Sequence, residues 1–173
     1  MKSIKCQGCG GLFPDIEGPS HRYMESCPGC WAAFGEVLAR EYSDPAYMVV
    51  HRLSVDTYAA QHPGRPSRQS IQSVGLHLIR LCLLLEQGTD TSHANEAMLA
   101  ATKIKHTFKW LEPPTSLGSM TVADVVAATT VETHVQGVKT WANVVWQAWS
   151  PHHATIHNWI SGQFGMSKRY LAN

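Results

Sequence analysis

The N-terminal segment carries two CxxC pairs, and this spacing constrains the fold more than any other feature of the chain. Cys6 and Cys9 form the first pair, Cys27 and Cys30 form the second, and seventeen residues separate the pairs. In each pair the two-residue gap permits a tight turn that brings both sulfur atoms to one metal. Four thiolates in tetrahedral geometry, at about 2.3 Å, are a common ligand set of structural zinc. The sequence therefore predicts one zinc ion held by Cys6, Cys9, Cys27 and Cys30.

The same cysteines have other interpretations, which are two redox disulfides or an iron centre. His21 lies between the pairs and can in principle replace one sulfur, although four cysteines suffice without it. Because four protein ligands leave no place for water, we expect a site that stabilises the fold and does not catalyse. Residues 1–30 contain few large apolar side chains, so they need a metal or a crosslink to hold a structure.

The composition is that of a packed globular protein. Hydrophobic residues make up 44% of the 173 residues and charged residues 16%, which excludes the disordered class. Lys and Arg number 14 against 13 Asp and Glu, so the net charge argues against nucleic acid as a partner. The sequence begins without the apolar stretch of a signal peptide, and no run of about 18 apolar residues follows. We therefore expect a cytoplasmic protein with no membrane contact.

Apolar residues recur at three- and four-residue spacing through most of the chain, which predicts helices. Proline, glycine and capping residues mark their ends. The expected helices span residues 31–42, 44–62, 67–86, 92–110, 122–129, 131–149 and 151–164. The predicted fold class is mainly α, with a four-cysteine zinc knuckle over residues 1–32 and a helical bundle domain over residues 33–173.

Histidines are abundant, at 10 residues, and two of them have the spacing of metal ligands. His153 and His157 are four residues apart on a predicted helix, so their rings lie one turn above the other and can bind one ion. A third ligand must come from another helix. His77, in the middle of an apolar segment, is the first candidate, and His134 and His51 are alternatives. The competing interpretation of His77 is an ordinary hydrogen bond, since a buried imidazole without a partner would be costly.

His51, Asp56 and His62 form a separate candidate group for acid–base catalysis. The two histidines are eleven residues apart, or about 16 Å along a helix, so they cannot share a metal. Asp56 and Tyr58 can orient a histidine of a neighbouring helix, although such residues also make ordinary hydrogen bonds between helices. Cys82, in an apolar helix, is expected to be a core residue and not a nucleophile.

The segment that starts at His51 and ends at Pro63 reads HRLSVDTYAAQHP. Together with the two CxxC pairs, it resembles a family of small bacterial proteins of unknown function. This resemblance covers most of the chain and implies no activity.

The helical part is also similar to the DinB/YfiT family of four-helix bundles. The similarity rests on His77 in the middle of one helix and on His153-x-x-x-His157 late in the chain. That family binds a divalent metal with one histidine of its second helix and two of a late helix, and several members act in thiol-dependent transfer or isomerisation. The resemblance implies His77, His153 and His157 as ligands of a second divalent metal. The cysteine knuckle and Pro151 depart from the family pattern.

Two functions follow from these observations, and an oligomeric structural protein is a third possibility. The first is a metal-dependent enzyme of a small-molecule substrate, in which an open His-rich site acts as a Lewis acid or generates hydroxide. The alternative is a non-enzymatic binding or interaction module that uses the zinc knuckle, in which the histidines satisfy hydrogen bonds in the core. A metal beyond one zinc per chain would favour the enzyme.

Overall fold

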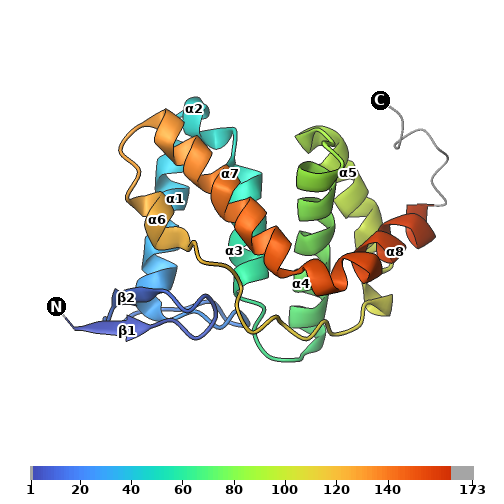
Figure 1. The fold of residues 1–173 in the computed structure, drawn as a ribbon, viewed down its shortest axis with the longest axis horizontal. Helices are drawn as coiled ribbons and strands as arrows, with labels where there is room; N and C mark the ends of the chain where they lie inside the picture. Colours follow the sequence, from blue (N-terminus) through green and yellow to red (C-terminus); the bar gives the residue numbers. More distant parts are fainter. Residues whose placement is uncertain (1, 165–173) are drawn as a thin grey trace.

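The computed structural model describes residues 2–164, whose regular elements are helices apart from one N-terminal hairpin (Figure 1). Strand β1 (Ser3–Lys5) pairs antiparallel with β2 (Leu12–Pro14), and Ile4 lies opposite Phe13. The loop between the strands carries the first CxxC pair. Each strand has only three residues, too few for an alternating pattern to show in the sequence.

Helix α1 (Pro28–Ser43) begins directly after Cys27, with a proline at its first position, where the missing N–H costs nothing. Cys30 therefore lies on the first turn of α1. The hairpin contacts this helix, so the second CxxC pair is carried to the loop of the first. The predicted bundle domain starts at residue 33, whereas α1 already starts within the predicted knuckle, and residues 165–173 of that domain lie outside the described residues.

The helix predicted over residues 44–62 is two helices. Asp44 caps α2 (Pro45–Met48) by accepting a hydrogen bond from the amide of Ala46, as its position before a proline indicated. Helix α3 (His51–Gln61) follows after a break at residues 49–50. Neither proline nor glycine marks this break, and two β-branched valines are its only sequence signal.

The remaining elements follow the predicted order. Ser67 caps α4, and Thr121 and Asp124 form the expected capping box before α6. The predicted helix over residues 92–110 ends early, at residue 102. The elements are α4 (Arg68–Leu81), the π-helical turn η1 (Cys82–Glu86), α5 (Thr91–Thr102), the 3-10 turn η2 (Lys105–Thr107), α6 (Val122–Val126), α7 (Val131–Ala148), the 3-10 turn η3 (Ser150–His152) and α8 (His153–Phe164).

Helix α3 lies at the centre of the packing, between α4 and α7 (Figure 1). Two buried tryptophans, one within α7 and one directly after it, form hydrogen bonds to α3. The indole of Trp141 donates to Gln61 Oε1 at 2.9 Å, and that of Trp149 donates to the carbonyl of Ala60 at 3.1 Å. Both indoles are fully buried and both N–H groups are satisfied, so these tryptophans are core residues.

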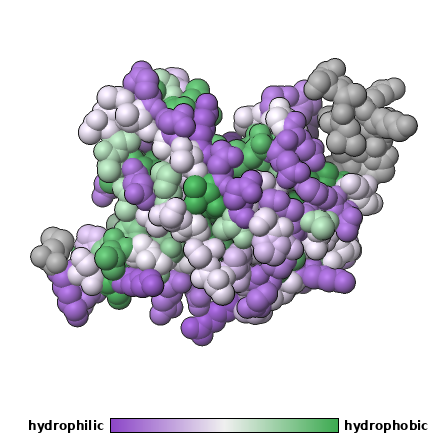
Figure 2. Space-filling model, viewed as in Figure 1, coloured by the Kyte–Doolittle hydropathy of each residue, from purple (hydrophilic) through white to green (hydrophobic). Residues whose placement is uncertain are grey.

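The space-filling view shows a mixed surface, with hydrophilic and hydrophobic side chains interspersed (Figure 2). A notch at the upper edge separates the helices around α1 and α2 from those around α4 and α5. None of the described helices is long and apolar enough to cross a membrane. The prediction of a mainly helical fold is confirmed.

Candidate metal centre

Cys6, Cys9, Cys30 and His62 converge on one buried point. Their sulfur and nitrogen ligand atoms all lie within 4.8 Å of one another. The sulfurs of Cys9 and Cys30 are 3.9 Å apart, and His62 Nε2 lies 3.6 Å from the sulfur of Cys6 and 3.4 Å from that of Cys30. Tetrahedral zinc, with bonds of about 2.3 Å to sulfur and about 2.0–2.1 Å to nitrogen, requires separations of about 3.8 Å and about 3.6 Å. The donor set therefore fits a tetrahedral ion.

His62 is oriented for this role by its own helix. Its Nδ1 lies 2.8 Å from the carbonyl oxygen of Tyr58, to which it donates. The neutral ring then carries no proton on Nε2, whose lone pair faces the sulfurs. The ring of Tyr58 stacks on that of His62 at 4.1 Å, and its hydroxyl lies 3.5 Å from the sulfur of Cys30.

The loop of the first CxxC pair is shaped by its glycines. Gly10 has a φ of 75°, which glycine adopts without steric cost, and its amide donates to the carbonyl of Cys6 at 2.9 Å. A Cβ at Gly8 would lie 2.3 Å from the carbonyl oxygen of Glu25 and 2.5 Å from Cδ2 of His62. Position 8 therefore accepts only glycine without displacing the imidazole.

The three thiols of the cluster differ in acidity. Hydrogen bonds from Cys30 and Cys9 lower the pKa of Cys6, against the opposing effect of burial. The hydrogen bonds that Cys30 shares with Cys6 and Cys9, together with burial, raise the pKa of Cys30. For Cys9, the contact with Cys30 lowers the pKa, but the contact with Cys6 and burial outweigh it and raise the pKa to about 12. Binding of a metal at this point would require all three thiols to lose their protons.

Cys27 lies at the edge of the cluster and outside its mutually close set. It is half-buried, burial raises the pKa of its thiol, and it interacts with the side chain of Cys6 and with the backbone amide of Cys30. The structure thus brings together three of the four predicted cysteines and adds His62, which sequence reasoning had placed in an acid–base group. No spacing rule links Cys30 to His62 across 32 residues, so no local signal could have shown that they are close.

A cavity of about 650 Å³ borders the centre, between the loop of residues 5–10 and the loop of residues 113–118. Gln61, adjacent to His62, holds the second loop by donating to the carbonyls of Leu117 at 3.0 Å and Met120 at 2.7 Å. The polar side chains that line the cavity belong to Lys5, Gln7, Glu25, Thr115 and Ser116.

A family model described as a family of unknown function, DUF5946, matches residues 4–150, which include every residue of the centre. The chain belongs to the DUF5946 family. The resemblance to a small family of unknown function is therefore confirmed. No curated protein and no solved structure matches the chain. The similarity to DinB/YfiT bundles stays a prediction.

In this DUF5946 chain, His77, His153 and His157 do not come together. His77 Nδ1 lies 2.6 Å from Asp56 Oδ1. His153 Nε2 lies 3.0 Å from the carbonyl of Trp146, and its ring stacks on that indole at 3.8 Å. The ring centres of His153 and His157 are 6.2 Å apart. His77 and His153 therefore each have a hydrogen-bond partner. For His77, an ordinary hydrogen bond was the competing interpretation.

The predicted acid–base group His51, Asp56 and His62 is likewise divided among separate networks. Asp56 is fully buried and accepts from Arg80 Nε at 2.5 Å and from Arg80 Nη2 at 2.6 Å. Such a two-pronged ion pair, together with His77, satisfies the carboxylate and joins α3 to α4. His62 lies in the candidate metal centre, and His51 binds a different carboxylate.

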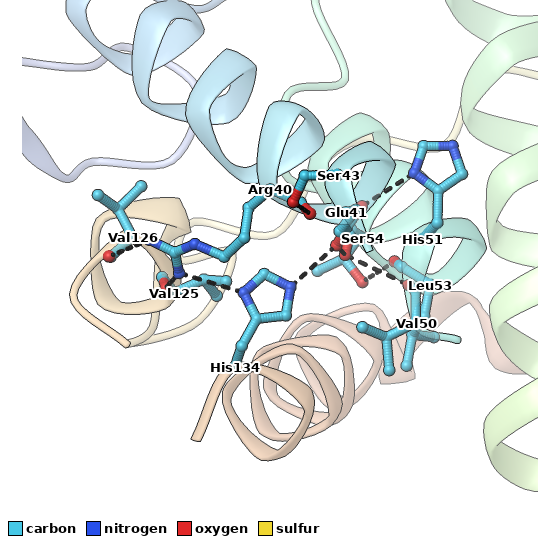
Figure 3. Close-up of polar contacts among 11 residues, drawn as sticks. Arg40, Glu41, Ser43, Val50, His51, Leu53, Ser54, Val125, Val126 and His134 are labelled. Carbon is cyan, nitrogen blue, oxygen red and sulfur yellow. Dashed lines mark hydrogen bonds and ion pairs between the residues drawn. The ribbon is translucent and has the colours of Figure 1, made fainter. Parts of the chain in front are cut away.

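That carboxylate is Glu41 of α1, which is fully buried and has three partners (Figure 3). His51 Nδ1 lies 2.9 Å from Oε2, His134 Nε2 lies 3.2 Å from Oε1, and the hydroxyl of Ser54 donates to Oε1. Glu41 therefore connects α1 with α3 and α7.

Arg40 completes this network and fixes the tautomer of His134 (Figure 3). Arg40 Nη1 lies 3.3 Å from His134 Nδ1, and the same guanidinium donates to the carbonyls of Val125 and Val126 at the end of α6. Because Arg40 can only donate, Nδ1 of His134 accepts and Nε2 carries the proton that faces Glu41. His134 and His51 thus serve a satisfied polar network, and neither joins the histidines proposed as metal ligands.

Proposed function

We propose that this protein binds one structural zinc ion through Cys6, Cys9, Cys30 and His62, and that the zinc forms one wall of a binding cavity for a small polar molecule. The match between the observed sulfur and nitrogen separations and the edges of a zinc tetrahedron carries the proposal. Thiolates with an imidazole favour zinc over magnesium and calcium, which take oxygen ligands.

The structural role follows from where the ligands come from. Cys6 and Cys9 belong to the hairpin loop and Cys30 belongs to α1. His62 directly follows the last residue of α3. The segment before α1 has few large apolar side chains, with Phe13 as its buried anchor. A metal bound at this point would tie the segment to two helices and add its binding free energy to folding.

Four protein ligands leave no coordination position for water, which favours a binding role over catalysis at this centre. The adjoining cavity supplies the place for a ligand. Its walls are the metal-bound loop and the loop that Gln61 holds, so loss of zinc would remove one wall. The mixed lining of Lys5, Glu25 and uncharged polar groups suits a small polar molecule better than an apolar one.

The ligand set is tested by measuring zinc per chain in protein purified without a chelator or a nickel column. We expect Cys30→Ser and His62→Ala each to lose one equivalent of zinc relative to the wild type, whereas Cys27→Ser keeps it. Loss in Cys27→Ser with retention in His62→Ala would instead restore the four-cysteine set. If the wild type holds no zinc even after dialysis against a zinc solution, the proposal is wrong.

The binding role is tested separately, by amide chemical shifts of ¹⁵N-labelled protein with a panel of small polar molecules. We expect changes concentrated in residues 7–10 and 115–118. Ser116→Trp should suppress them by filling the cavity, and Ser119→Trp, at an exposed position outside the lining, should not. If the chemical shift changes in the wild type lie outside the cavity residues, the binding role is contradicted and only the structural zinc remains proposed.

A further inference from the structure

Cys82, Glu86 and His157 gather where α4 and its π-helical turn η1 meet α8, at the end of the molecule away from the hairpin (Figure 1). One ligand atom from each residue lies within 4.8 Å of the other two. Cys82 is fully buried, whereas the side chains of Glu86 and His157 are each 40% exposed. A thiol thus lies beneath a carboxylate and an imidazole that solvent can reach.

The backbone is shaped to bring two of these residues together. Residues Cys82–Glu86 form a π-helical turn, in which the amide of Gln87 donates to the carbonyl of Cys82, five residues earlier, at 3.2 Å. The wider turn places residues four apart on nearly the same side. Single π-helical turns are rare in proteins and are frequent at functional sites. This turn is an observation independent of the side-chain cluster.

His157 supplies the third donor from a different helix. Its Nε2 is shielded from solvent and lies 2.8 Å from Glu86 Oε1. A shielded ring nitrogen that lies 2.8 Å from a carboxylate oxygen and within 4.8 Å of a thiol sulfur has the placement of a metal ligand.

We infer that Cys82, Glu86 and His157 bind a second zinc ion whose fourth position is open to solvent. The thiolate selects zinc over magnesium and calcium, and three protein ligands with one free position are the arrangement of zinc sites that bind water or a substrate. This inference does not depend on the first centre, which shares no residue with it. It keeps His157 from the sequence prediction and replaces His77 and His153, whose ring nitrogens have other partners.

The test is zinc content of the full chain after dialysis against excess zinc and removal of free metal. We expect two equivalents in the wild type and one in both His157→Gln and Glu86→Gln, two substitutions at partly exposed positions that leave the core unchanged. His153→Gln, one turn earlier on the same helix, is the matched control and should retain two. Cys30→Ser should lose the other equivalent, so the two centres are counted separately.

A cobalt-substituted sample gives the second readout. In the Cys30→Ser background, the near-ultraviolet absorption of a cobalt–thiolate bond should remain and should disappear with Cys82→Ser added. A wild type that holds one equivalent, lost in Cys30→Ser, would overturn this second site while leaving the first intact. Retention of two equivalents in His157→Gln, or loss of one in His153→Gln, would overturn this ligand set.

Discussion

The ring of His62 is held 2.8 Å from the carbonyl oxygen of Tyr58, one turn earlier in the same stretch of chain. That hydrogen bond occupies Nδ1 and leaves Nε2 to face the sulfurs of Cys6 and Cys30. The hydroxyl of Tyr58 lies 3.5 Å from the sulfur of Cys30. A single tyrosine therefore orients one proposed zinc ligand through its backbone and contacts another through its side chain.

Tyr58→Phe separates these two contributions. The carbonyl that holds His62 remains, so we expect one zinc still to bind at this centre. The thiolate of Cys30 loses a donor, and loss of such an outer hydrogen bond lowers metal affinity by roughly 10- to 100-fold. Competition with a chromophoric chelator measures the change. Tyr42→Phe, an exposed tyrosine of α1 far from the cysteines, should leave the affinity at the wild-type value.

Gly8→Ala tests the close contact between the first CxxC loop and His62. An added Cβ would lie 2.3 Å from the carbonyl oxygen of Glu25 and 2.5 Å from the imidazole, so the loop and the ring must move apart. We expect weaker zinc binding and a lower unfolding temperature. Gly35→Ala, where no atom lies within 4 Å of the added Cβ, should instead stabilise α1 by about 0.5–1 kcal/mol. Equal zinc affinity in the two variants would contradict the contact.

Local signals predicted much of the fold because they depend only on neighbouring residues. The caps at Ser67 and Thr121 and the start of α2 at Pro45 were found this way. The break at residues 49–50 and the early end of α5 at residue 102 were missed, because neither has proline or glycine to mark it.

The candidate site shows the same division more sharply. The three cysteines proposed as ligands follow from CxxC spacing, which is a local constraint on a turn. The fourth proposed ligand is His62, which the packing of α3 against the hairpin loop brings close to Cys30. No sequence periodicity predicts this contact. Likewise, Glu41 contacts His134 and Asp56 contacts His77 because the fold brings their helices together. No sequence rule pairs these residues.

Glu41→Ala tests the buried carboxylate that joins three helices. The substitution leaves the ring N–H groups of His51 and His134 without their acceptor, whereas the hydroxyl of Ser54 keeps the carbonyl of Val50 at 3.3 Å. Each unsatisfied buried group costs about 1–3 kcal/mol, so we expect the free energy of unfolding to fall by roughly 2 kcal/mol or more. Urea denaturation in the presence of zinc measures the loss.

Glu36→Ala is the matched control, because Glu36 is exposed on the same helix. Its free energy of unfolding should change by no more than about 0.5 kcal/mol. Zinc content should be unchanged in both variants, since Glu41 belongs to a network separate from the cysteines. A stability of Glu41→Ala equal to that of Glu36→Ala would mean that the network contributes little to folding.

Removal of the metal with a strong chelator should act locally. Without zinc, the hairpin keeps only Phe13 as a buried anchor, so we expect the amides of residues 2–27 and the end of α3 to lose protection in hydrogen exchange. Helices α4 and α7 should stay protected, because their buried residues pack on the helical core. Protection should return when zinc is added back. Uniform loss across α4 and α7 would mean instead that the ion holds the whole fold, and unchanged exchange in residues 2–27 would remove its structural role.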